Sequence, residues 1–166
     1  RTRRQRQMCI RDRNIDIQQV KVPNTLKAIS KIANKWRMKF DIPVIGITGS
    51  NGKTSTKELL SHVLSSKFKM HATKGNFNTK IGLPLTLLGM KKNHDISILE
   101  MGSSAPGEIE ALCQLEKPTH GIITNIEPAH LEGFGSIETI AYEKGALFRS
   151  LDKGISFVNK ADKLVS

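Results

Sequence analysis

The sequence predicts an α/β fold in which a mostly parallel β-sheet is covered by helices on both faces. Short apolar runs alternate along the chain with segments of helical periodicity, and a glycine-rich turn joins one of these runs directly to a helix. Strands separated by helices of this length are joined by right-handed crossovers, which produce parallel pairing. The chain has 166 residues, of which 38% are hydrophobic, and this is enough for one domain with its own core.

The expected strands are short apolar runs bounded by turn residues. The clearest is the alternating run 95–101, while the run 44–48 leads into the glycine-rich turn. Because a parallel sheet brings the carboxyl ends of its strands to one edge, residues at these ends are expected to share a ligand crevice. In chain order we expect strands over 15–22, 44–48, 68–73, 95–101, 121–126 and 155–158.

The expected helices carry apolar residues spaced to lie on one face. Helices are expected over 24–36, 54–66, 81–88, 107–116 and 137–151. The first has Asn24 or Thr25 as its N-cap, and its inward residues are Leu26, Ile29, Ile32, Ala33 and Trp36. The second is expected to turn inward Leu59, Leu60, Val63 and Leu64.

The formal charge of +11 suggests a nucleic-acid partner, but its distribution argues against one. Residues 1–13 hold six Arg and one Asp (+5), and the rest holds 20 basic and 14 acidic residues (+6). Residues 3–13 also match one reading frame of a transposase-type sequencing adapter, so we exclude 1–13 from the fold as a translated, disordered scar. The alternative is a basic arm that binds RNA, DNA or acidic lipid. An adapter also suggests a reading frame cut short at one or both ends.

Outside residues 1–13 the chain holds one cysteine, Cys113, which we expect to be a small buried side chain in the helix over 107–116. One cysteine forms no internal disulfide, which suits a reducing cytoplasm. No apolar run approaches the ~18 residues of a membrane span, and no signal peptide is visible. We therefore expect a soluble, cytoplasmic protein without a membrane span, and we expect a monomer.

The turn after the run 44–48 has the pattern of a phosphate-binding loop, because residues 46–54 read GITGSNGKT. Glycines let backbone amides approach phosphate oxygens, and the start of a helix adds unpaired amides and a positive dipole end. The usual pattern, G-x-x-x-x-G-K-[ST], has glycine where this chain has Ile47, so an ordinary glycine-rich turn is the alternative. We infer a P-loop NTPase-like sheet that binds ATP and Mg²⁺ through Gly49, Ser50, Asn51, Gly52, Lys53, Thr54 and Ser55.

Two charged residues are expected to face this loop. Glu100 ends the run 95–101, where a carboxylate is costly to bury unless it is paired or bound to a cation. Lys144 falls on the apolar stripe of the helix over 137–151, seven residues from both Ile137 and Leu151. The alternatives are an ion-paired or solvent-facing Glu100 and a lysine that extends past the helix rim. We interpret Glu100 as a Mg²⁺ ligand and Lys144 as a lysine with a lowered pKa.

Three further residues are weaker candidates. His130 follows the strand over 121–126 and is expected near the same crevice, as a metal ligand or as an ordinary loop residue. Asn76 and Asn78 lie in the turn-forming segment 75–79, where they either shape the turn or donate hydrogen bonds to a substrate.

Four segments resemble the Mur ligases, which build the peptide of peptidoglycan. They are GITGSNGKTSTKE, TKGNFNTKIGLPLTLL, ILEMGSSAPGEIEALC and ITNIEPAHLEGFGSIETIAYEKGALF. The first fits any Mur ligase and the related folylpolyglutamate synthases, including the missing first glycine. The others are more specific and most resemble the members that add D-alanyl-D-alanine. The chain departs from the family's usual pattern at residues 103–105 and at Glu127.

The resemblance implies roles for individual residues. Lys53 and Thr54 would hold ATP phosphates and a first Mg²⁺, with Glu100 and His130 at the metal site. Lys144 matches a lysine that CO₂ converts to a carbamate, which helps to hold a second Mg²⁺. Asn76 and Asn78 would lie near the uridine-nucleotide substrate. The expected catalytic residues are thus Lys53, Lys144 and His130, and the expected metal ligands are Thr54, Glu100, His130 and Lys144.

The resemblance also implies a reaction and a division of the chain. The reaction is ATP-dependent amide ligation of D-alanyl-D-alanine to UDP-N-acetylmuramoyl-tripeptide through an acyl phosphate. Residues 14–40 would be the tail of a UDP-substrate domain with a linker helix, and 41–166 the first part of the ATPase domain, without a C-terminal domain. Such a fragment is expected to be inactive alone. The alternatives are another Mur ligase, a folylpolyglutamate synthase-like ligase, and a non-catalytic nucleotide- or nucleic-acid-binding module.

Overall fold

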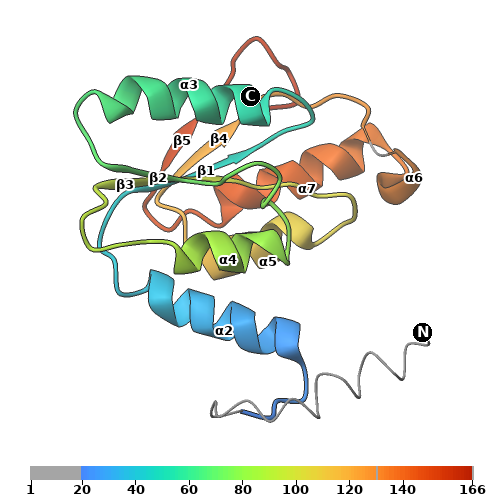
Figure 1. Cartoon of the computed structure of the whole chain (residues 1–166). Coiled ribbons are helices and arrows are strands. Elements are labelled where there is room, and N and C mark those ends of the chain that lie inside the picture. The colour runs from blue at the N-terminus through green and yellow to red at the C-terminus, as the bar shows by residue number, and fades with distance from the viewer. Residues whose placement is uncertain (1–19, 130, 166) are drawn as a thin grey trace.

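The computed structural model describes residues 20–129 and 131–165, which contain a five-stranded parallel sheet (Figure 1). The strand order is β2-β3-β1-β4-β5, and every neighbouring pair is parallel. The central strand β1 therefore has its carboxyl end beside those of β3 and β4. The strands are β1 (Val44–Thr48), β2 (Met70–Ala72), β3 (Ile96–Glu100), β4 (His120–Ile123) and β5 (Ile155–Phe157).

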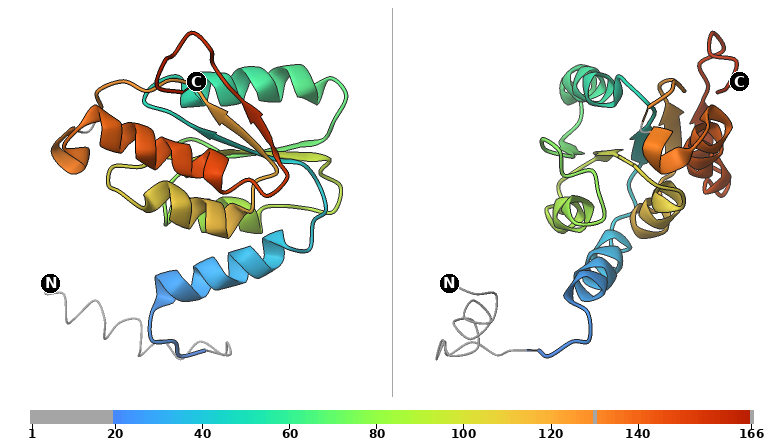
Figure 2. Two further views of the ribbon diagram at one scale, coloured as in Figure 1. Left: turned by 180° about the vertical axis from the view of Figure 1, so that it is seen from behind. Right: turned by 90° about the vertical axis from the view of Figure 1, so that its right-hand side faces the viewer.

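Helices cover both faces of this sheet, as the sequence predicts. Helix α3 (Lys53–Ser65) lies on one face, whereas α4 (Gly82–Leu88), α5 (Glu108–Glu116) and α7 (Ile137–Arg149) lie on the other (Figures 1 and 2). Helix α2 (Thr25–Arg37) forms a further layer against α4 and α5. The predicted α/β class is therefore confirmed. No helix in the described ranges has the length and apolar character needed to cross a membrane.

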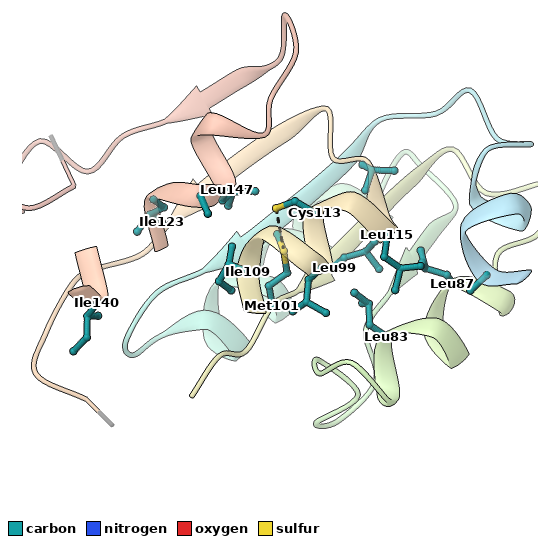
Figure 3. Packing of buried hydrophobic residues seen from close by; sticks show 14 of the residues in the cluster. Leu83, Leu87, Leu99, Met101, Ile109, Cys113, Leu115, Ile123, Ile140 and Leu147 are labelled. Carbon is teal, nitrogen blue, oxygen red and sulfur yellow. Dashed lines mark hydrogen bonds between the residues drawn. The ribbon is translucent and has the colours of Figure 1, made fainter. Parts of the chain in front are cut away.

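The main core lies between the sheet and the helices α4, α5 and α7 (Figure 3). Leu99 and Met101, at the end of β3, pack against Ile109 and Cys113 of α5, and the Cys113 sulfur lies 3.8 Å from that of Met101. Cys113 is buried, as predicted. Burial raises the pKa of its thiol to about 12, so this side chain packs as a small apolar group and supplies little thiolate.

The inward face predicted for α3 is partly wrong. Leu59 and Val63 are exposed, while Leu60 and Leu64 are only half-buried. The buried residue of this helix is Lys57. Apolar spacing identifies a helix but does not fix which face turns inward. Here α3 turns Lys57 inward, and this side chain contacts Thr73 and Glu100.

Smaller differences concern α2 and the element boundaries. Asn24 is the N-cap of α2, as predicted, but Leu26 and Ile32 are exposed, because the helix buries Ala33 and Arg37 instead. Arg37 donates to the carbonyls of residues 116 and 117 at the end of α5. Carbonyls at a helix C-terminus have no partner within the helix, so Arg37 supplies one. Residues 20–22 are not a strand. The short helix α6 (Leu131–Phe134) is not predicted, and residues 1–13 lie outside the described part of the chain.

Candidate functional site

The loop between β1 and α3 has the geometry of a phosphate-binding loop. Gly49 has a φ of +147°, and a Cβ atom there would collide with Thr124 Oγ1. Gly52 is the N-cap of α3 at a φ of +76°, and no side chain caps this helix. The first amides of α3 therefore remain available to an anion. Ile47, in place of the usual first glycine, is fully buried within β1 and pairs with Glu100.

The segment after β4 braces this loop. The amides of Ser50 and Asn51 donate to the backbone oxygen and the Oδ1 of Asn125, over 3.0 and 2.9 Å. Ser50 Oγ accepts from the amide of Glu127 and donates to its carbonyl. The Asn51 side chain donates to the Glu127 carboxylate over 2.6 Å. Two of the predicted phosphate-binding amides are thus engaged within the protein.

Lys53 spans the loop from the start of α3. Its Nζ donates to the carbonyls of Gly49 and Ser50 over 2.7 and 3.0 Å. Burial lowers the pKa of Lys53, and the nearby Glu100 carboxylate opposes that shift. A phosphate group that accepts from the α3 amides can also accept from this ammonium, which then exchanges neutral carbonyl partners for an anion.

Glu100 lies at the carboxyl end of β3 with an exposed fraction of only 3%. Its Oε2 accepts from Thr54 Oγ1 over 3.0 Å, and its Oε1 accepts from Asn78 Nδ2 over 2.8 Å. These oxygens fit Mg²⁺, which takes one or two protein ligands and completes its shell with phosphate and water. Across the described ranges, no cluster of three or more His, Cys, Asp or Glu could hold a metal by itself. The oxygens of Glu100 and Thr54 suit a metal that arrives with a nucleotide.

Lys144 is buried, with an exposed fraction of 3%, as its place on the apolar stripe of α7 predicts. Its Nζ donates to Ser103 Oγ over 2.7 Å and lies 5.7 Å from the centre of the Phe134 ring. Burial, reinforced by the positive charge of Lys53, lowers the pKa of Lys144 to about 8, while Glu143 and Glu108 oppose this shift. An appreciable fraction of the amine is therefore neutral near pH 8.

Lys53 and Lys144 line one cavity of about 420 Å³, and Thr54 and Glu100 are not among its lining residues. The phosphate loop, the segment after β2, the segment after β3 and α7 each contribute to its walls. Asn78 lines the cavity, whereas Asn76 is exposed and does not line it. His130 lies outside the described residues, so its metal role stays a prediction. The lining residues are Gly49, Ser50, Lys53, Asn78, Thr79, Lys80, Ile81, Gly102, Ser103, Ser104, Glu108, Ala129, Phe134, Ile140 and Lys144.

Two acidic residues that organise the site are not predicted from the sequence. Glu143 is buried beside Lys144 on α7, and its carboxylate accepts from the amides of Gly107 and Ile109 at the start of α5. Glu108 forms an ion pair with Lys80 over 3.1 Å at the cavity rim. The signal for Glu143 is its place on the apolar stripe of α7, three residues after Ile140 and four before Leu147, where a carboxylate needs partners.

Comparison with known proteins places this site in a family. Residues 47–166 match the Mur ligase middle domain. The UDP-N-acetylmuramoyl-tripeptide–D-alanyl-D-alanine ligase of Bacillus subtilis (strain 168) is 45% identical over 130 residues, which cover 78% of this chain and 28% of that protein. The chain thus spans less than a third of that relative.

Solved structures agree with this match. A crystal structure of MurF from Acinetobacter baumannii is similar with a TM-score of 0.85 and 33% identity, covering 93% of this chain and 35% of that one. The MurF ligase of Thermotoga maritima, solved in complex with ADP, is similar with a TM-score of 0.79 and 35% identity, covering 87% and 34% of the two chains. With the matched domain covering most of its length, the chain belongs to the Mur ligase family.

Proposed function

We propose that this chain is the ATP-binding part of a carboxylate–amine ligase that joins D-alanyl-D-alanine to UDP-N-acetylmuramoyl-tripeptide in peptidoglycan synthesis. The observation that carries the proposal is the meeting of Lys53, Asn78 and Lys144 on one cavity, where Asn78 also donates to Glu100, the partner of Thr54. The Bacillus relative, a D-alanyl-D-alanine ligase, supports the reaction, and the Thermotoga relative, solved in complex with ADP, supports the nucleotide.

In this proposal the phosphate loop binds the triphosphate. The α3 amides and Lys53 would donate hydrogen bonds to the β- and γ-phosphates, while Thr54 and Glu100 would hold Mg²⁺. The bound Mg²⁺ would draw charge from the transferring phosphoryl group. The γ-phosphoryl passes to the terminal carboxylate of the muramoyl tripeptide and gives an acyl phosphate. The amine of D-alanyl-D-alanine then attacks this carbonyl, and inorganic phosphate leaves.

Lys144 is proposed to act as a carbamate. Its neutral amine adds to CO₂ to form a nitrogen–carbon bond, and a proton is released to solvent. The product replaces a cation with an anion whose oxygens can help to hold a second Mg²⁺. The support is the burial of Lys144, its pKa near 8 and its place on the cavity of Lys53. Loss of the positive charge would also relieve its repulsion with Lys53.

The substrate side of the proposal rests on the segment after β2. Asn78 lines the cavity, and the exposed Asn76 precedes it by two residues, so we assign both to the uridine-nucleotide substrate. We also propose that the enzyme acts as a monomer. ATP and UDP-linked precursors are cytoplasmic compounds, so we place the reaction in the cytoplasm, with no role for nucleic acid.

The test uses the complete protein encoded by the gene. It is incubated with ATP, Mg²⁺, UDP-N-acetylmuramoyl-tripeptide and D-alanyl-D-alanine, and the pentapeptide product is measured by mass spectrometry together with phosphate release. The proposal expects one phosphate for each pentapeptide. Phosphate release that depends on a folate, or on a single amino acid in place of the dipeptide, would assign another ligase of the superfamily. Nucleotide binding without turnover on any acceptor would favour a non-catalytic module.

A further inference from the structure

Helix α3 buries a lysine where an apolar residue is expected. Lys57 has an exposed fraction of 1%. Its Nζ donates to the Thr73 carbonyl over 2.8 Å, lies 2.9 Å from a Glu58 carboxylate oxygen, and lies 4.0 Å from Glu100 Oε2. A buried ammonium is costly unless such partners compensate it. A side chain that served packing alone would not need these polar partners.

Lys57 and Thr54 approach the same atom. The two residues are three apart on α3 and so lie on one face of the helix. The Thr54 hydroxyl lies 3.0 Å from Glu100 Oε2, and the Lys57 ammonium lies 4.0 Å from that oxygen. Thr54 is exposed and Lys57 is buried, so one turn of α3 places an accessible hydroxyl and a buried cation near this carboxylate.

A second route joins Lys57 to Glu100 through Thr73, which follows β2. Lys57 Nζ donates to the Thr73 carbonyl, and the Glu100 amide donates to Thr73 Oγ1 over 3.0 Å. The Thr73 amide in turn donates to the Ile98 carbonyl in β3. Lys57 therefore connects α3 to the ends of both β2 and β3, at the point where Glu100 leaves the sheet.

The two carboxylates near Lys57 differ in their surroundings. Glu58 is closer but 67% exposed, whereas Glu100 is 3% exposed. Water and salt screen the exposed pair strongly, whereas the buried pair is screened much less. Despite the longer distance, Glu100 is thus a substantial electrostatic partner of Lys57.

We propose that Lys57 is a positioning residue of the metal site, which holds the Glu100 carboxylate against Thr54 and thereby sets the affinity for the Mg²⁺–nucleotide complex. The inference rests on the proposed function, because it assumes that Mg²⁺ binds with the nucleotide. Lys57 is 1% exposed, whereas Thr54 is exposed, so Lys57 approaches the carboxylate from the interior of the protein.

The experiment compares ADP binding by calorimetry, with excess Mg²⁺ and with EDTA, for the chain and for Lys57→Met and Lys57→Gln. Lys67→Met removes an exposed lysine just beyond the same helix and serves as the control. Mg²⁺ should raise the affinity for ADP, and we expect this increase to be smaller by about tenfold or more in both Lys57 variants. A loss of this size is typical when a partner of a metal ligand is removed. ADP affinity in EDTA should stay close to that of the unaltered chain, and Lys67→Met should change neither quantity.

Other outcomes contradict the inference. If the Lys57 variants keep the full effect of Mg²⁺, Glu100 does not depend on Lys57. If affinity falls equally with and without Mg²⁺, or if the chain fails to fold even with the polar Lys57→Gln, the role of Lys57 is structural. The unaltered chain tests the proposed function separately: if it does not bind ADP at all, the nucleotide assignment itself fails.

Discussion

Thr54 and Glu100 are 46 residues apart in the sequence, yet Thr54 Oγ1 donates to Glu100 Oε2 over 3.0 Å. The contact follows from the topology. Helix α3 begins just after β1, and β3 is the parallel neighbour of β1, so the first turn of the helix reaches the end of the adjacent strand. This pair places a hydroxyl and a carboxylate where a metal that accompanies a nucleotide needs oxygen ligands.

Glu100→Gln is expected to abolish most of the metal dependence of nucleotide binding. The amide keeps the shape of the side chain but removes the charge that attracts a divalent cation. The affinity for Mn²⁺ in the presence of ADP should fall by about 10–100-fold. It is measured from the loss of the free Mn²⁺ signal in electron paramagnetic resonance. The exposed Glu110→Gln is the control, and equal Mn²⁺ binding by both variants would remove Glu100 from the metal site.

Lys53→Met should weaken ADP binding without affecting adenosine. The variant loses a charged donor at the phosphate loop, a contact worth about 1.5–3 kcal/mol or roughly 10–100-fold in affinity. Competition with a fluorescent ADP analogue measures both ligands, and the exposed Lys92→Met is the control. A parallel loss of adenosine affinity would show that Lys53 supports the fold of the site and not the phosphates.

Gly49→Ala should destabilise the chain more than Gly75→Ala. Both glycines have positive φ, but only at Gly49 does a Cβ atom meet Thr124. Backbone strain of this kind costs about 1–3 kcal/mol, and the collision adds to it, whereas Gly75→Ala pays only for its conformation. Urea unfolding gives both values. Equal destabilisation would mean that the loop can move away from the segment after β4.

Lys144 should make stability depend on pH in a defined window. Its folded pKa of about 8 lies below the usual 10.5, so the unfolded chain binds more protons between these values. Stability due to Lys144 therefore rises from pH 8 to 10.5, by an amount on the order of 2–4 kcal/mol. Urea unfolding measures the free energy of unfolding of the unaltered chain and of Lys144→Met. The difference between the two should shift by that amount in favour of the unaltered chain from pH 8 to 10.5. A constant difference from pH 7 to 10.5 would contradict the lowered pKa.

The same neutral amine should react with CO₂. With ¹³C-labelled bicarbonate, a carbamate resonance in the ¹³C spectrum is expected to grow as the pH rises through about 8, where the Lys144 amine loses its proton. The resonance should be absent from Lys144→Met and present in Lys80→Met, which alters another lysine of the cavity. A signal that survives Lys144→Met would assign the carbamate to a different lysine.

The sheet could be predicted because its central strands β1 and β3 are mostly buried apolar runs, a pattern that the order of residues reveals. The five strands from residue 44 onward all form near their predicted positions. The inward face of α3 could not be predicted, because Lys57 is buried by contacts with Thr73 and Glu100 that are distant in sequence. Local periodicity gives the type of element, whereas partners in other elements decide its rotation.

For the site, the sequence identified the residues whose chemistry is local. The phosphate loop and Lys144 stand out from their own segments as a glycine pattern and a charge on an apolar stripe. The bracing of Ser50 and Asn51 by Asn125 and Glu127 could not be foreseen, because it joins segments more than 70 residues apart.

The central claim is that a nucleotide with its Mg²⁺ binds at the start of α3 and is held by residues from neighbouring strand ends. A crystal structure of the chain with Mg²⁺ and a non-hydrolysable ATP analogue tests it directly. We predict phosphates on the α3 amides and on Lys53, Mg²⁺ between Thr54 and Glu100, and Lys144 facing the γ-phosphate. A nucleotide bound elsewhere, with Thr54 and Glu100 still hydrogen-bonded to each other, would contradict the account.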